Sequence, residues 1–166
     1  TIQSLTPTGL FYGLLTLAQL EKGRQIPCVK VKDTPRFPYR GLMIDCSRHF
    51  WTKKFIMKQL DAMAYFKLNR FHWHLTDGGR WRMEVKQYPR LTNETAYRTQ
   101  SDWVKWWMEK DRKYCPVGTP GAYGGYYTQQ DIKDIVRYAA ARHITVIPEI
   151  EMPGQSDEVV YAYPEL

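Results

Sequence analysis

Polar residues of types that bind or transform ligands follow three short apolar runs of the sequence. The three groups are Asp45, Arg48 and His49; His72, His74 and Asp77; and Glu149, Glu151 and Gln155. In parallel α/β folds the carboxyl ends of the strands meet at one edge of the sheet, and ligands bind there. If the three runs are such strands, their polar groups converge on one site. For Asp45 taken alone, we expect the commoner role of N-cap to the following helix.

Two kinds of chemistry fit these side chains. His72 and His74 are two residues apart, so a strand places both imidazoles on one face, where they could bind zinc together with Asp77. The chain has only four histidines, however, which leaves few further ligands, and no metal site is predicted.

Carbohydrate binding is the alternative. The planar guanidinium of Arg48 can hold vicinal hydroxyls through paired hydrogen bonds, and Asp77 or Glu151 could anchor it or hold a catalytic proton.

The elements that would position these residues can be read from apolar spacing. We predict strands at 42–45, 70–75 and 144–150, and helices at 10–20, at 53–67 after the cap Thr52, and after the capping-box pattern Thr128-x-x-Asp131. The order is a helix followed by β-α-β-α-β, which predicts an α/β protein with a parallel sheet and right-handed crossovers. Three prolines predict an extended connection at 26–39.

Residues 80–125 form a long insertion, rich in Trp and Tyr, that has no strong period. We expect it to be an irregular functional loop. Its aromatic rings could stack on the apolar faces of a sugar.

Composition excludes several function classes. The net charge is +7, but the basic residues are scattered and no basic arm is present, so a nucleic-acid partner is not predicted. The three cysteines lack the CxxC spacing of a zinc site. No signal peptide is evident at the start, and the apolar run 10–20 is too short to span a membrane.

Four strings identify a family that the chain resembles: RGLMIDCSRHF at 40–50, HWHLTD at 72–77, GGYYTQ at 124–129 and VIPEIEMPG at 146–154. In this order and spacing they resemble family 20 glycoside hydrolases, the β-N-acetylhexosaminidases. The resemblance implies the first three β/α units of a (β/α)8 TIM-type barrel at 40–166. It also implies that residues 1–25 end a preceding small α/β domain and that 26–39 is the linker.

The implied reaction is the retaining exo-hydrolysis of terminal N-acetylglucosamine or N-acetylgalactosamine. It needs no cofactor, because the acetamido oxygen of the substrate is the nucleophile. By resemblance, Arg48 binds the O3 and O4 hydroxyls of the sugar and Asp77 supports the catalytic centre through a hydrogen-bonded relay. Glu151 is expected to help hold Arg48. Gln155 stands where the family usually has a histidine, and an amide cannot titrate.

The Asp-Glu catalytic pair of the family lies on the fourth strand, beyond Leu166, so we expect this segment alone to be inactive. Asp157 and Glu158 are adjacent but misplaced, and we interpret them as acidic residues at a helix N-terminus. The expected partners are an amino-sugar glycan and the remainder of the barrel or a partner chain. The expected location is an extracellular, periplasmic or lysosome-like compartment.

Two other functions remain open. One is a non-catalytic, truncated sugar-binding or structural module, which Gln155 mildly favours. The other is a metal-dependent amidohydrolase that uses His72 and His74.

Overall fold

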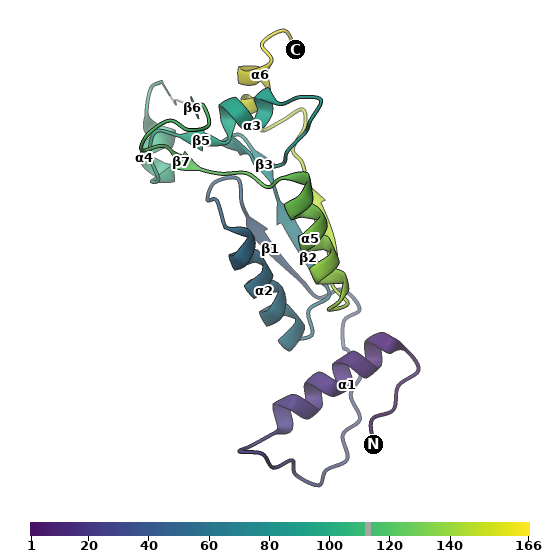
Figure 1. Cartoon of the computed structure of the whole chain (residues 1–166). Coiled ribbons are helices and arrows are strands. Elements are labelled where there is room, and N and C mark those ends of the chain that lie inside the picture. The colour runs from purple at the N-terminus through teal and green to yellow at the C-terminus, as the bar shows by residue number, and fades with distance from the viewer. Residues whose placement is uncertain (112–113) are drawn as a thin grey trace.

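A parallel three-stranded sheet forms the centre of the computed structural model, which describes residues 1–111 and 114–166. Residues 112 and 113, within the predicted insertion, lie outside the described residues. The strands are β1 (Gly41–Asp45), β2 (Arg70–His74) and β8 (Thr145–Glu149), in the order β1-β2-β8 (Figure 1). The register places Asp45, His74 and Glu149 side by side at the carboxyl end of the sheet. The three predicted strands are therefore confirmed, each to within a residue at either end.

Two helices, α2 (Lys53–Tyr65) and α5 (Gln129–Ala140), connect the strands and pack against each other. Both begin at the predicted caps: Thr52 accepts a hydrogen bond from the Phe55 amide, and Thr128 forms a reciprocal capping box with Asp131. Helix α2 ends two residues earlier than predicted, because Lys67 takes a left-handed conformation with φ of 58°.

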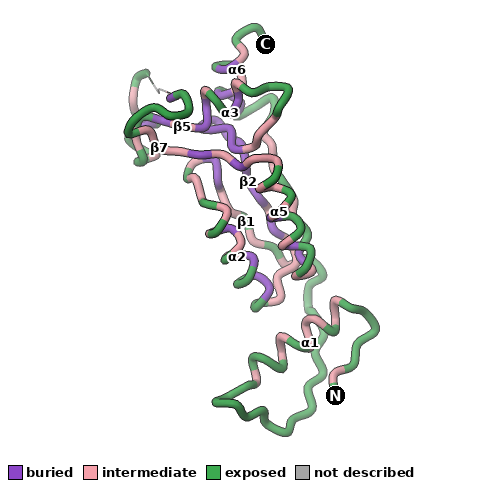
Figure 2. The backbone as a smooth tube through the Cα atoms, viewed as in Figure 1, coloured by how far each residue is buried: buried purple, intermediate pink, exposed green. Residues whose placement is uncertain are grey.

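The main core lies between these helices and the sheet. It is built from the apolar stripe of each helix and from alternating residues of β2, which is the most deeply buried strand of the three-stranded sheet (Figure 2). Fully buried members include Ile56, Leu60, Phe71, Trp73 and Ile135. Strand β2 is central because it has a neighbour on both sides, and this explains why its residues are buried more fully than those of β1 and β8.

Helix α1 (Pro7–Leu20) lies at the amino-terminal end of the sheet, away from the polar strand ends (Figure 1). Its Thr8 hydroxyl is 3.0 Å from Nδ1 of His143, and Gln19 donates to the carbonyl of Tyr65. The predicted apolar stripe is not buried here: Leu14, for example, is 57% exposed. Residues 26–39 contain no helix or strand.

The long insertion is more ordered than the sequence suggested, so the expectation of an irregular loop is wrong. It contains short helices and strands that form a layer at the carboxyl end of the main sheet (Figure 1). These elements are β4 (Arg80–Trp81), α3 (Arg90–Thr95), β5 (Tyr97–Arg98), α4 (Trp103–Met108), β6 (Tyr114–Cys115) and β7 (Tyr123–Gly124). Strand β3 (Thr76–Asp77), just before the insertion, pairs with β4. Helix α6 (Asp157–Ala162) packs against α3.

A buried arginine explains this order. Arg82 is 0% exposed, and its guanidinium donates to four main-chain carbonyls, those of Cys46, Ser47, Ala96 and Gly125, at 2.5–2.8 Å. Burial lowers its pKa to about 10, so the group stays charged at neutral pH. One cation therefore joins the end of β1 to two distant parts of the insertion.

No helix among the described residues is both long and apolar enough to cross a bilayer.

Candidate active site

Arg48 is held rigidly at the carboxyl end of β1 by two carboxylates. Its Nη1 lies 2.8 Å from Asp45 Oδ2, and its Nη2 lies 2.6 Å from Asp77 Oδ2. Asp45 also accepts a hydrogen bond from the Arg48 main-chain amide at 3.0 Å. Asp45 is therefore not the N-cap of the following helix, a role that Thr52 takes. Instead it fixes the turn that carries Arg48.

Asp77 is the most buried carboxylate of the site, with 5% exposure, and it contacts two cationic or imidazole groups. Besides Arg48, its Oδ2 lies 3.3 Å from Nε2 of His74. The main chain of Asp77 is also fixed, because the buried Ser47 hydroxyl donates to its carbonyl. The Arg48 side chain is about a third exposed, so its guanidinium is accessible to a ligand while the buried Asp77 fixes its position.

The two histidines of β2 meet the end of β8. Oε2 of Glu149 is 2.5 Å from His72 Nε2 and 3.7 Å from His74 Nδ1. A single carboxylate thus contacts both imidazoles, which confirms that His72 and His74 lie on one face of the strand. His74, Glu149 and Glu151 also offer ligand atoms within 4.8 Å of one another, a spacing that could hold a metal ion.

Glu151 lies near Nε2 of His74, the same ring nitrogen that faces Asp77, and does not contact Arg48. Its Oε1 is 3.9 Å from His74 Nε2, and its carboxyl group lies close to that of Glu149. Within the described part of the chain, the ion pairs of Arg48 go to Asp45 and Asp77. The expected contact between Glu151 and Arg48 is therefore replaced, because β1 itself supplies an anchor in Asp45.

Gln155 lies beside the turn that follows Asp77. A Cβ atom at Gly78 would come within 3.1 Å of its Oε1, so the close approach favours glycine there. The Gln155 backbone is left-handed, with φ of 55°, and the residue is exposed. The Gln155 amide therefore lies next to Gly78, the residue that directly follows Asp77. Among the described contacts, no hydrogen bond joins the side chains of Gln155 and Asp77.

The acidic pair at 157–158 begins helix α6, as expected, but one member is hidden. Glu158 is 0% exposed, and neither of its carboxylate oxygens has a hydrogen-bond partner among the described residues. Burial raises its pKa to about 8. Arg80, which is also fully buried, lies near enough to lower that pKa slightly.

Two aromatic residues that the sequence reasoning did not single out, Trp51 and Tyr123, lie against the predicted site residue His49. Nδ1 of His49 is 2.8 Å from the Tyr123 hydroxyl, and the His49 ring lies 4.2 Å from that of Trp51. A shallow groove includes Arg48, His49 and Trp51. A Cβ atom at Gly124 would clash with the Ala96 carbonyl oxygen, so only glycine fits directly after Tyr123.

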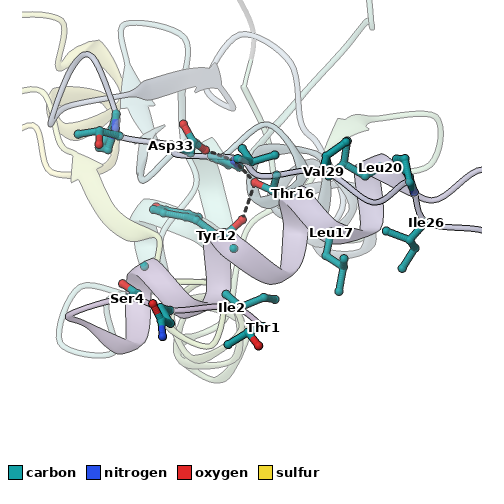
Figure 3. A pocket seen from close by; sticks show the side chains of 18 of the residues that line it. Thr1, Ile2, Ser4, Tyr12, Thr16, Leu17, Leu20, Ile26, Val29 and Asp33 are labelled. Atoms are coloured by element: carbon teal, nitrogen blue, oxygen red, sulfur yellow. Dashed lines mark hydrogen bonds and ion pairs between the residues drawn. The ribbon is translucent and has the colours of Figure 1, made fainter.

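A separate pocket lies at the opposite end of the molecule, between α1 and residues 26–36 (Figure 3). Tyr12 and Thr16 of α1 face Asp33 across it, and Lys67 bonds both Thr16 and Asp33. Most of its lining residues are exposed. None of its lining residues belongs to the polar site at the carboxyl ends of β1, β2 and β8.

The parallel sheet and the charged row at its carboxyl end define an α/β protein with an enzyme-like site. Residues 37–166 match the model of "Glycosyl hydrolase family 20, catalytic domain". The chain belongs to this family.

Relatives with similar sequences have consistent names. The chain is 46% identical to a "Beta-hexosaminidase" of Porphyromonas gingivalis, covering 95% of this chain and 20% of that protein. It is 42% identical to a "Beta-hexosaminidase" of Akkermansia muciniphila, covering 95% and 30%. The chain thus spans less than a third of the length of either relative.

Solved structures agree on the fold. A structure described as "A Glycoside Hydrolase Family 20 beta-N-Acetylglucosaminidase" matches with a TM-score of 0.80 at 38% identity, over 100% of this chain and 31% of that one. The exo-β-N-acetylglucosaminidase of Vibrio harveyi, in complex with N-acetylglucosamine, matches with a TM-score of 0.77 at 36% identity, over 95% and 24%. The α/β fold of this chain is similar to part of each.

Proposed function

We propose that this chain is part of a retaining exo-β-N-acetylhexosaminidase that removes terminal N-acetylglucosamine or N-acetylgalactosamine from glycans. The observation that carries the proposal is the pairing of Arg48 with both Asp45 and Asp77 at the strand ends. An immobilised guanidinium can hold vicinal sugar hydroxyls without further ordering cost. The names of the related hexosaminidases support the same substrate class.

In this proposal Arg48 binds the sugar and Asp77 supports the catalytic centre. The acetamido oxygen of the substrate attacks the anomeric carbon, so the protein supplies no nucleophile of its own. Glu151 and Gln155, which lie close to Asp77 and to the following Gly78 respectively, are proposed to tune Asp77. The general acid and the carboxylate that orients the acetamido group come from residues outside this chain.

The segment itself is proposed to supply the first three units of a (β/α)8 barrel at 40–166, with 26–39 as a linker and 1–25 as the end of a preceding small domain. A partial barrel leaves open strand edges, so the remainder of the barrel or a partner chain would complete it. We place the enzyme in an extracellular, periplasmic or lysosome-like compartment, where glycan substrates are found.

The test is release of p-nitrophenol from the N-acetylglucosaminide and N-acetylgalactosaminide by the intact natural protein. Arg48→Met is expected to lower kcat/KM by about 100-fold or more, because two charge-assisted hydrogen bonds are lost. Arg137→Met is the matched control, since Arg137 is 77% exposed on α5. No turnover by the intact protein, with sugar binding retained, would instead support the non-catalytic module.

The metal-dependent amidohydrolase remains as a second candidate because His74, Glu149 and Glu151 are close enough to share an ion. Elemental analysis of the purified protein decides this point. Stoichiometric zinc, with activity lost on chelation and restored by zinc, would favour this candidate over the glycosidase.

A further inference from the structure

Ser47 directly precedes Arg48, and its side chain reaches the turn that carries Asp77. The residue is fully buried. Its hydroxyl oxygen lies 3.0 Å from the carbonyl oxygen of Asp77 and 3.1 Å from that of Arg80. A hydroxyl has one proton, so this donor is shared between the two carbonyls. A single side chain therefore fastens both ends of the turn.

The turn between these two carbonyls has little freedom to move. Asp77 and Arg80 are register partners of β3 and β4, and Gly78 and Gly79 join them. A Cβ atom at Gly79 would clash with the ring of Trp103, so the turn is packed closely against the insertion. The position of the Asp77 carboxylate therefore depends on where the two carbonyls are held.

The main chain around Ser47 is fixed as well. Its carbonyl accepts a hydrogen bond from Arg82 Nη2 at 2.8 Å, and the Cys46 carbonyl accepts one from Arg82 Nε at 2.8 Å. The Cys46 amide donates to the carbonyl of His74, the last residue of β2, at 2.9 Å. The Ser47 hydroxyl thus extends from a backbone that is itself anchored.

The ion pair of Arg48 with Asp77 joins the same two segments of the chain. Arg48 Nη2 lies 2.6 Å from Asp77 Oδ2, and the Ser47 hydroxyl connects the segments again through the Asp77 carbonyl. A binding group keeps its geometry only when its supporting residues are held by packing and hydrogen bonds. The buried link through Ser47 is such a support for the partly exposed guanidinium.

We propose that Ser47 is a positioning residue for sugar binding: its hydroxyl ties the backbone of Asp77 to that of Arg48, so that the carboxylate holds the guanidinium where it receives the sugar hydroxyls. This inference rests on the proposed hexosaminidase function. Without the hydroxyl, two buried carbonyls lose a shared donor and the turn shifts away from position 47. The loss acts through Arg48, because Ser47 itself is buried.

The first experiment is a double-mutant cycle on hydrolysis of the p-nitrophenyl N-acetylglucosaminide by the intact protein. Ser47→Ala is expected to lower kcat/KM about tenfold in the wild-type background, but less than about twofold in Arg48→Met, where the group it positions is gone. An equal loss in both backgrounds, or an unchanged kcat/KM in Ser47→Ala alone, overturns the inference. Ser47→Cys, with a weak thiol donor, should fall between the wild type and Ser47→Ala, and it takes the place of Ser47→Ala if that variant does not fold.

Thr92→Val is the matched control. Thr92 is buried, and its hydroxyl donates to the carbonyl of Pro89 at the start of α3, so this variant also removes one buried hydroxyl and keeps a similar shape. It is expected to lose stability in urea unfolding, as Ser47→Ala does, but to keep kcat/KM within about twofold of the wild type. A similar drop in kcat/KM for both variants would be a general effect of destabilisation and would refute a specific role for Ser47.

A crystal structure of the intact Ser47→Ala variant tests the positioning role without any turnover. The contact between Arg48 and Asp77 is expected to lengthen or to take more than one arrangement, and an unchanged pair overturns the inference. No turnover by the wild type refutes the proposed function, while the crystal structure still decides the role of Ser47. Turnover with an additive cycle refutes the role of Ser47 and leaves the hexosaminidase intact.

Discussion

The buried carboxyl group of Glu158 gives the most direct test of the structure. Its two oxygens have no partner among the described residues, and burial raises its pKa from 4.5 to about 8. An acid whose pKa is raised on folding opposes folding when it ionises. This cost is absent below the unfolded pKa, grows as the pH rises toward 8, and then stays constant.

The magnitude follows from the two pKa values. Between about pH 5 and about pH 8, the unfavourable contribution of Glu158 to the free energy of unfolding grows by roughly 3 kcal/mol. Glu158→Gln keeps the shape of the side chain and removes the ionisation. The buried amide still lacks partners, but that cost is the same at both pH values, so the pH dependence isolates the charge.

The assay is urea unfolding of the wild type, Glu158→Gln and the exposed control Glu165→Gln at several pH values in this range. The variant should gain stability relative to the wild type as the pH rises, by about 3 kcal/mol over the range, while the control should stay parallel to the wild type. If Glu158→Gln instead loses stability relative to the wild type as the pH rises, Glu158 is ion-paired with Arg80 and the reasoning is refuted.

Three further predictions follow from single residues. Arg82→Met should lower the free energy of unfolding by roughly 3–5 kcal/mol, because four carbonyls lose their donor, and equal stability of wild type and variant by urea titration would contradict this. Thr128→Ala should cost about 1 kcal/mol by removing the capping box, measured in the same way. Gln155→His adds an imidazole that ionises near neutral pH, so the pH–rate profile of the intact enzyme should change between about pH 5 and about pH 8. Superimposable profiles would exclude a role for position 155 in tuning Asp77.

Much of the sheet and its helices could be predicted because their signals are local. Strand β2 and helix α2 carry apolar residues at the spacing of a strand and of a helix, and the caps at Thr52 and Thr128 sit within a few residues of the amides they bind. The insertion could not be predicted in this way. Arg82 orders it by contacts with residues 14 to 43 positions away, which no local pattern reveals.

In the candidate site, too, the sequence predicts one part and leaves another to the tertiary structure. The sequence alone determined which polar residues follow the three strands, since strand ends are read from apolar runs, and the motifs pointed to the glycosidase family. Only the tertiary structure decided how these residues pair: Arg48 with Asp45 and Asp77, and Glu151 with Glu149 and His74. For Arg48 with Asp77 and for Glu151 with His74, the physical reason is that the partners follow different strands, so their distances depend on sheet register and twist rather than on sequence spacing.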